Sequence, residues 1–442
     1  GQMTVVVAAE HGTLDLDESA ATGVTLTGDQ TSSVMLQGDL QGINDILAAG
    51  VVYQGLPDWN GPDVVTVSAD DLGNWPPPPQ TASRSFTVNV AAADGIRQRR
   101  LEGIRIGNPA VPADRAMLVA AIREADEMAT AIPSVTFYAA GGETSIAAML
   151  ADGVAPGKPR VLYASENNNY AAEILHGELL KRAPAERFRD LALLDTVIGK
   201  MSGVIASPEE MRALGLAPLV AGGDRCVLVE EFNRILVSRV PAGWPRRAIG
   251  VFEEKDDLLP FEEAKLFGHN AVHALLGYLA ERRGISAMSA IRGAPDLLAT
   301  GRRAFLDESG AALVAKHAAT GDPLFTPDGW RAYAEDLLVR MTNPWLADRV
   351  ERIIRDPRRK LAWGDRFFGT MRVALSQGVE PRTLALGTAA AVDHALRAET
   401  GLPAAPDAAR RFLLALWKNE ADAGLRERCL ALAVGALGEL AP

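Results

Sequence analysis

Residues 261–280 read FEEAKLFGHNAVHALLGYLA, and this stretch decides how the second half of the chain folds. Apolar residues recur at the three- and four-residue spacing of an amphipathic helix. The same stretch carries a lysine, an asparagine and two histidines among its apolar residues, and three of these polar side chains are singled out: Lys265, Asn270 and His273. An unpaired polar group in a packed helix costs roughly 1–3 kcal/mol, so three of them indicate a functional site on this helix.

The spacing of these three residues places them on one side of the predicted helix. At about 100° per residue, Asn270 lies about 140° from Lys265, and His273 lies about 80° from it. A lysine held among apolar groups loses hydration, and its pKa is expected below the usual value of about 10.4, as a general acid or base requires. The structural alternative is that Lys265 extends into solvent and His273 is a hydrogen-bonded core histidine.

Composition limits the classes of protein to consider. The 442 residues are 48% hydrophobic, which is enough for two or three domains. The net charge of −11 argues against a nucleic-acid surface. The sequence contains no apolar run long enough to span a membrane. The first residues also lack the pattern of a signal peptide, so we expect a cytoplasmic protein. The two cysteines, Cys226 and Cys429, form no disulfide or metal pattern, and we expect buried thiols and no metal site.

Residues 1–92 have the alternating pattern of short β-strands. Stretches such as VTLTG, SVMLQG and DVVTVSAD lie between turn residues, and the prolines at 76–79 predict a loop. About seven strands at this spacing predict an all-β sandwich.

Within this region, LQGDLQGINDILAAGVVYQGLPDWNGPDVVTVSADD (residues 36–71) resembles the cadherin-like repeats of bacterial surface adhesins. The resemblance implies a structural spacer, and it gives an exported or surface-associated location as the alternative to the cytoplasm. Such repeats hold calcium in some acidic loops, and DLDES at residues 15–19 is the candidate here. Solvated turn carboxylates are the favoured alternative, because calcium needs six or more converging oxygens.

After residue 92 the pattern changes. Residues 93–250 alternate predicted strands, at 128–132, 160–166 and 225–232, with amphipathic helices, which predicts part of an α/β sheet. Residues 251–442 contain almost no strand pattern and predict an all-α domain. The expected chain is therefore multidomain, with an N-terminal β-sandwich, a partial Rossmann-like α/β sheet and a C-terminal helical domain.

The spacing Lys-x4-Asn-x2-His at residues 265–273 resembles the signature of the long-chain polyol dehydrogenases, the mannitol and mannitol-1-phosphate dehydrogenase family. MTNPWLADRVERIIRDPRRKLAWGDRF (residues 341–367) is similar to another part of this family's pattern. The segments EADEMATAI, LYASENNNYAAEIL and LLDTVIGKM resemble its nucleotide-domain strands. The resemblance covers residues from about 100 to about 400.

The resemblance implies NAD as cofactor and a polyol or polyol phosphate as substrate, interconverted with the ketose. It implies that Lys265 is the general acid and base, that Asn270 and Asn167 stabilise the developing alkoxide, and that His273 positions the substrate and the lysine. It places three residues beside the nicotinamide: Thr130, Ala131 and Glu166. It places four more near the substrate entrance, where a structural ion network is an equal alternative: Arg359, Lys360, Asp365 and Arg366.

The sequence departs from the family at the nucleotide-binding loop. The family begins with Gly-x-Gly-x-x-Gly, whose peptide N–H groups hold the pyrophosphate. We find no such loop, and the pairs Gly141–Gly142 and Gly222–Gly223 lack its spacing. Gly199 also stands where the family usually has an aspartate.

Two hypotheses follow from this departure. The first is an active NAD-dependent polyol dehydrogenase. The second is a catalytically inactive fusion or remnant with a binding or scaffolding role. A truncated parallel sheet would also leave an open edge, where a partner protein or a second copy could pair.

Overall fold

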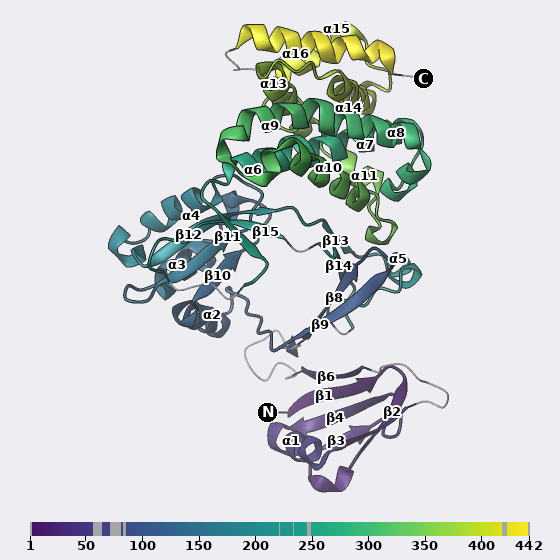
Figure 1. The fold of residues 1–442 in the computed structure, drawn as a ribbon. Coiled ribbons are helices and arrows are strands. Elements are labelled where there is room, and N and C mark those ends of the chain that lie inside the picture. Colours follow the sequence, from purple (N-terminus) through teal and green to yellow (C-terminus); the bar gives the residue numbers. More distant parts are fainter. Residues whose placement is uncertain are drawn as a thin grey trace. The chain divides into compact units, whose positions relative to one another are not determined.

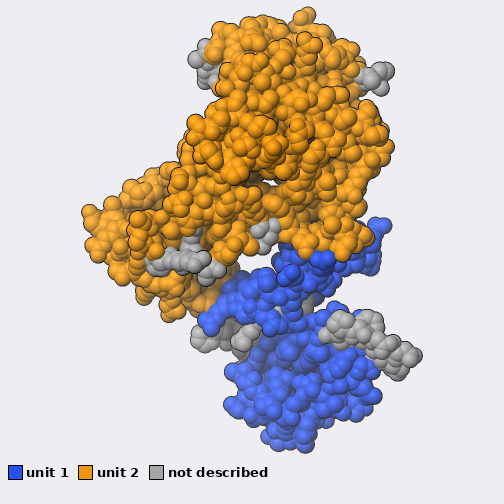
Figure 2. Space-filling view, in the orientation of Figure 1, with its two compact units in different colours: residues 1–90, 96–106, 203–229 blue, residues 91–95, 107–202, 230–442 orange. Residues whose placement is uncertain are grey.

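The computed structural model describes residues 2–55, 64–70, 81–82, 85–220, 222–232, 234–244, 249–417 and 422–440. The chain separates into two compact units (Figure 2). Unit 1 combines residues 1–90, 96–106 and 203–229, and unit 2 combines residues 91–95, 107–202 and 230–442. The predicted proline loop at 76–79 and the Asn-Gly-x-Asp turn at 60–63 lie outside the described residues.

The first sheet of unit 1 is antiparallel, with strand order β3-β4-β1-β6-β7 (Figure 1). Val5, Val7, Val34 and Leu36 alternate along β1 and β4 and are buried in one core, as in a sheet with one covered face. The strands are β1 (Gln2–Ala9), β3 (Thr25–Thr27), β4 (Ser33–Asp39), β6 (Val65–Asp70) and β7 (Thr81–Ala82).

A helix, α1 (Leu40–Ala49), follows β4 and packs on the same core. It begins where the Asp39 side chain accepts a hydrogen bond from the Gly42 N–H at 2.8 Å, and it buries Ile43 and Ile46. Two further strands, β2 (Gly12–Leu16) and β5 (Val51–Gly55), form a separate antiparallel pair. The predicted all-β sandwich is therefore not confirmed, because an apolar spacing of three residues forms a helix between the strands.

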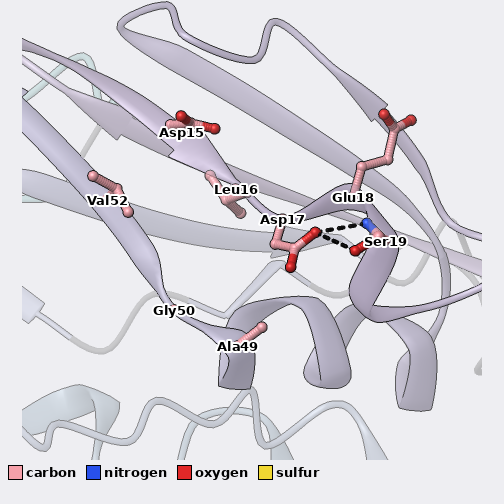
Figure 3. A pocket seen from close by; sticks show the side chains of 8 residues that line it. All are labelled: Asp15, Leu16, Asp17, Glu18, Ser19, Ala49, Gly50 and Val52. Atoms are coloured by element: carbon pink, nitrogen blue, oxygen red, sulfur yellow. Dashed lines mark hydrogen bonds between the residues drawn. The ribbon is translucent and has the colours of Figure 1, made fainter.

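The acidic stretch at residues 15–19 lines an open cavity in unit 1 (Figure 3). The Asp17 carboxylate accepts hydrogen bonds from the Ser19 hydroxyl at 2.6 Å and the Ser19 N–H at 2.9 Å, which lower the pKa of Asp17. These bonds cap the short turn η1 (Glu18–Ala20). No cluster of three or more potential metal-ligand side chains was found within the described part of the chain.

The second sheet of unit 1 has the order β13-β14-β8-β9. Asn89 on β8 ties this sheet to the segment before β14, because its amide donates to the Val227 carbonyl at 3.2 Å and the Ala217 carbonyl at 2.8 Å and accepts from the Ala217 N–H at 2.9 Å. The predicted boundary at residue 92 falls between two strands of this sheet. The strands are β8 (Ser85–Ala91), β9 (Ile96–Glu102), β13 (Ser202–Ile205) and β14 (Cys226–Glu230), with α5 (Pro208–Ala213) between the last two.

Unit 2 contains the predicted α/β sheet, with strand order β10-β11-β12-β15-β16. The strands β10, β11 and β12 are parallel, and β15 pairs antiparallel to β12. Leu162 on β11 packs in a core with α3 and α4, whereas Val161 and Tyr163 pack in a second core. The elements are β10 (Glu127–Thr130), β11 (Arg160–Ala164), β12 (Leu191–Ile198), β15 (Ile235–Ser238), β16 (Phe252–Lys255), α2 (Pro112–Glu124), α3 (Ile146–Gly153) and α4 (Ala171–Leu180).

The remainder of unit 2 is helical, as predicted. The central helix α7 (Asn270–Arg282) buries all residues from 271 to 280. It packs against α8, α11 and α14. The others are α6 (Leu259–Glu263), α8 (Pro295–Arg303), α9 (Ala311–His317), α10 (Pro327–Met341), α11 (Val350–Ile354), α12 (Pro357–Lys360), α13 (Phe368–Ser376), α14 (Arg382–Thr400), α15 (Pro406–Leu416) and α16 (Ala423–Gly435), with π-helical turns η5 (Ala264–His269) and η7 (Ala304–Gly310).

A glycine permits close packing against the central helix. A Cβ atom on Gly387 of α14 would lie 2.6 Å from the Leu275 Cγ on α7. The Leu275 side chain of α7 therefore packs directly on the backbone of α14 at Gly387, where a side chain would not fit.

Both cysteines are buried free thiols, as expected. Among the described residues, no helix is long and apolar enough to cross a lipid bilayer.

Candidate active site

The predicted lysine lies on a π-helical turn and not on a regular α-helix. The Asn270 N–H donates to the Lys265 carbonyl five residues earlier, which closes the wider turn η5 between α6 and α7. Residues five apart are brought toward the same face by such a turn, whereas a regular α-helix separates them by about 140°. The assumption of an unbroken α-helix was therefore wrong, and the correction strengthens the pairing of Lys265 with Asn270.

Lys265 also contacts the end of the parallel sheet. Its ammonium donates to the Asn167 side-chain oxygen at 3.2 Å, and Asn167 lies just after β11. Burial lowers the pKa of Lys265, the positive charge of Arg366 lowers it further, and the negative charge of Glu262 opposes both. The structure thus brings Lys265, Asn270 and Asn167 together from two distant parts of the sequence.

These residues line a polar cavity of 170 Å³, here called the amide cavity. Its walls include four asparagine side chains beside the lysine: Asn167, Asn168, Asn169 and Asn270. Glu262 on α6 lines it as well and is buried. Burial raises the pKa of Glu262 to about 7, and the charge of Asp195 acts in the same direction.

A second cavity, of 290 Å³, shares Lys265 and Asn270 with the first and is here called the cation cavity. The described residues that line it include no aspartate or glutamate. They include six basic side chains: Lys200, Lys265, Arg352, Arg359, Lys360 and Arg366. This concentration of positive charge is notable in a chain whose net charge is −11.

Lys360 is a buried member of this group of cations. It is 3% exposed, and its ammonium makes no hydrogen bond or ion pair with a described residue. Burial lowers the pKa of Lys360 to about 8, the positive charges of Arg366 and Arg359 lower it further, and the negative charges of Asp356 and Asp365 oppose the shift. A buried ammonium without a partner is costly, so an anion in the cavity would stabilise it.

The other predicted entrance residues form local pairs. Arg359 pairs with Asp356 at 3.1 Å, and Arg366 pairs with Asp365 at 2.8 Å. Asp365 lines the amide cavity together with both arginines. The predicted alternatives of ion pairing and substrate contact are thus compatible, because paired residues also line the site.

His273 is buried and lines the cation cavity. Its Nε2 atom lies 3.2 Å from a carboxylate oxygen of Asp348, which is also buried. No contact between His273 and Lys265 is found, so the expected orientation of the lysine by this histidine has no direct geometric counterpart among the described residues.

The three residues predicted beside the nicotinamide have different environments. The Glu166 carboxylate accepts hydrogen bonds from the Thr130 hydroxyl at 2.9 Å, the Ile132 N–H at 3.0 Å and the Tyr138 hydroxyl. Thr130 and Glu166 therefore tie the end of β10 to the loop after β11. Ala131 is exposed at the end of β10, and of the three only Glu166 lines the amide cavity.

The loop after β12, which lines the cation cavity, is held by a buried ion pair. Arg340 on α10 bonds both oxygens of Glu230, at 2.6 and 2.8 Å, and also the Gly199 carbonyl at 2.7 Å. Glu230 in turn accepts the Met201 N–H at 2.5 Å. Glu230 and Arg340 thereby fix the loop that carries Lys200.

Four residues at the site were not identified from the sequence. Glu262 precedes Lys265 by three residues in the quoted helix, and that spacing was an available signal. Asp348 and Arg352 belong to the family-like run at residues 341–367, but their proximity to His273 is a tertiary contact. Lys200 had no sequence signal, since its neighbour Gly199 marked a departure from the family.

Comparisons with known proteins bear on this site. A sequence model described as the mannitol dehydrogenase C-terminal domain matches residues 257–403. A mannitol-1-phosphate 5-dehydrogenase of Arthrobacter sp. (strain FB24) is 30% identical over 312 residues, covering 70% of this chain and 75% of that protein. Another, from Brevibacillus brevis (strain 47 / JCM 6285 / NBRC 100599), is 29% identical over 313 residues, covering 69% and 78%.

Solved structures share the fold. A D-sorbitol dehydrogenase in substrate-free form aligns with a TM-score of 0.61 and 15% identity, over 80% of this chain and 83% of that chain. The Pseudomonas fluorescens mannitol 2-dehydrogenase, in a ternary complex with NAD and D-mannitol, aligns with a TM-score of 0.56 and 18% identity, over 80% of each chain. A Rossmann-like α/β part followed by a helical part fits both neighbours.

Proposed function

The chain belongs to the mannitol dehydrogenase family, a family of polyol oxidoreductases, and on that premise we propose that it oxidises a polyol phosphate to the ketose phosphate with NAD, and catalyses the reverse reduction. The proposed substrate is mannitol 1-phosphate or a similar polyol phosphate. The observation that carries the choice of a phosphate is the cation cavity, with its six basic residues and the unpaired ammonium of Lys360.

The cation cavity suits a phosphate group in charge and in the kind of donors that line it. Arginine forks bind phosphate oxygens through two parallel hydrogen bonds, and lysine adds a point charge. Lys360, Arg352 and His273 line the same cavity as Lys265, so we propose that the phosphate and the reacting carbon of one substrate molecule both lie in it.

Lys265 is the proposed proton acceptor in oxidation. The lowered pKa makes its neutral amine available nearer to neutral pH, and that amine takes the hydroxyl proton of the substrate while the carbon gives up hydride. In reduction, the ammonium returns the proton. NAD, when bound, supplies the hydride acceptor.

Asn167 and Asn270 are proposed to stabilise the alkoxide that forms between these steps. The Asn167 oxygen already accepts from Lys265, which leaves its amide N–H groups to donate to the substrate. Asn270 lines both cavities and can donate from the helix side. Donors fixed before reaction cost no reorganisation when charge develops.

The residues of unit 2 fit part of NAD. The ends of parallel β10 and β11 carry the proposed nicotinamide neighbours Thr130, Ala131 and Glu166, and Asn167 follows directly. The glycine-rich pyrophosphate loop of the family has no counterpart in the sequence, so we assign no residue to the pyrophosphate.

The strand β10 forms one edge of the α/β sheet. Among the described strands, β10 pairs only with β11. We keep the proposal that a partner protein or a second copy pairs at this edge.

The alternative of an inactive remnant makes a different prediction in a binding assay. We expect saturable quenching of tryptophan fluorescence by NADH in the micromolar range, and a rise in melting temperature with mannitol 1-phosphate that mannitol at the same concentration does not give. No binding at millimolar NADH would favour the remnant. Equal stabilisation by both polyols would remove the argument for a phosphate.

Three further expectations stay proposals. Residues 1–92 would form a cadherin-like spacer, supported by the antiparallel sheet and helix of unit 1. The remaining chain would divide into parts 93–250 and 251–442. The NAD chemistry favours a cytoplasmic location, with export through the spacer as the alternative.

A further inference from the structure

A single buried carboxylate connects two residues of the cation cavity. Asp348 has a side chain that is 1% exposed. Its Oδ1 accepts a hydrogen bond from Arg352 Nε at 2.8 Å, and Arg352 Nη2 lies 2.7 Å from the same oxygen in an ion pair. Its Oδ2 lies 3.2 Å from His273 Nε2. Within the described part of the chain, both Oδ2 and Nε2 are buried and neither makes a hydrogen bond of good geometry, so the 3.2 Å approach of the two atoms is the polar contact that each has.

The backbone around Asp348 is fixed independently of these side chains. The Asp348 carbonyl accepts the Met288 N–H at 2.9 Å, and the Val350 N–H donates to the Ser286 carbonyl at 2.9 Å. Both bonds hold the start of α11 against one short segment. The carboxylate is therefore presented from a rigid position, as a residue that orients a catalytic side chain must be.

We propose that Asp348 is a positioning residue that fixes the proton of His273 on Nε2 and aims Arg352 into the same cavity. The inference rests on the proposed polyol phosphate reaction and names how that site recognises its substrate. In the neutral ring, a proton on Nε2 leaves the Nδ1 lone pair to accept a hydrogen bond from a substrate hydroxyl.

The charge state of Asp348 supports this assignment. Burial acts to raise the pKa of Asp348, but the contacts with His273 and Arg352 outweigh it and hold the pKa below the usual value. An ionised carboxylate cannot donate, so the proton between Oδ2 and Nε2 belongs to the histidine. A purely structural role, in which Asp348 only neutralises Arg352, would place no requirement on the His273 tautomer.

The tautomer can be measured without any turnover. Nitrogen-15 NMR of histidine-labelled full-length protein, with the His273 signal identified by its loss in His273→Gln, distinguishes the two ring nitrogens. We expect the Nε2–H form in the wild type. The Nδ1–H form, or a mixture of both, would overturn the proposal, and this reading depends on no variant of Asp348.

Asp348→Asn provides the second test. The asparagine oxygen would accept from Arg352 and its NH2 group would face His273, which requires the proton to move to Nδ1. We expect this tautomer change, together with a fall in kcat/KM on the order of 100-fold, as for a misplaced catalytic contact. The matched control is Asp336→Asn, which also removes a carboxylate paired with an arginine, Arg340 at 3.1 Å, but leaves His273 untouched.

The outcomes separate this inference from the proposed function. An unchanged tautomer in Asp348→Asn, with normal turnover in the wild type, would refute the positioning role and leave the function intact. Conversely, the NMR experiment could give the expected tautomers while the wild type fails to oxidise mannitol 1-phosphate. That result would support the positioning role of Asp348 and refute the proposed substrate.

Discussion

Replacing Lys360 by methionine should make the protein more stable and a poorer binder of phosphate. The lysine is 3% exposed, and no described residue pairs with its ammonium. Methionine keeps most of the side-chain volume and removes the charge. The buried positive charge of Lys360 therefore destabilises the folded protein, and a bound anionic ligand would offset this destabilisation.

The magnitude follows from the pKa of Lys360. The value of about 8 compares with 10.5 for the free side chain, and each pH unit corresponds to about 1.36 kcal/mol, so the charged ammonium destabilises the fold by about 3 kcal/mol. The folded state binds fewer protons than the unfolded state between these two values. Wild-type stability therefore rises as the pH increases from 8 to 10.5, and the full cost is present below pH 8.

The assay is urea unfolding of wild type and Lys360→Met at two pH values. We expect the variant to be more stable by about 3 kcal/mol at pH 7 and by only about 1 kcal/mol at pH 10. Lys181→Met, at a lysine that is 68% exposed and paired with Glu178, is the control and should change stability by less than about 0.5 kcal/mol.

The same variant should raise KM for mannitol 1-phosphate by roughly 10- to 100-fold, because a hydrogen bond to a charged group contributes about 1.5–3 kcal/mol. KM for mannitol should change less. A variant that is no more stable than wild type at pH 7, or one with unchanged KM for the phosphate, would refute the argument for an unpaired ammonium at the phosphate position.

Other predictions test neighbouring parts of the site. Glu262→Gln removes the negative charge that raises the pKa of Lys265, so the pH–rate profile of oxidation should shift to lower pH; a shift in the opposite direction would contradict the arrangement. Inorganic phosphate should inhibit competitively with mannitol 1-phosphate and less strongly at high salt, and noncompetitive inhibition would place the anion elsewhere. Gly387→Ala should cost about 1–3 kcal/mol in urea unfolding, because its Cβ would meet Leu275, whereas Gly435→Ala has open space and should not destabilise.

The sequence could predict the helical part and the central residues of the site because these depend on local pattern. The apolar spacing of residues 261–280 predicts a buried helix, and residues 271–280 are all buried. The π-helical turn could not be predicted in this way, because the same residues satisfy an unbroken α-helical pattern. The π-helical turn brings Asn270 toward the same side of the helix as Lys265.

Long-range partners account for the remaining differences. The strands β8 and β9 have clear alternating patterns, but their sheet partners β13 and β14 follow more than 100 residues later. Asp348 lies 75 residues after His273, and no periodicity connects them. The helix α1 lies between strong strand signals, and the capping by Asp39 and the burial of Ile43 and Ile46 fix its place in the structure.

The central claim is that Lys265, Asn167 and Asn270 form a polyol oxidation site completed by the cation cavity. The most direct measurement is NADH formation by the purified full-length chain with NAD and mannitol 1-phosphate, compared with mannitol and with Lys265→Ala. The account predicts turnover that favours the phosphate and is lost in Lys265→Ala while the variant remains folded. Turnover that persists in Lys265→Ala would contradict it, as would a wild-type chain that binds NADH and mannitol 1-phosphate but forms no product.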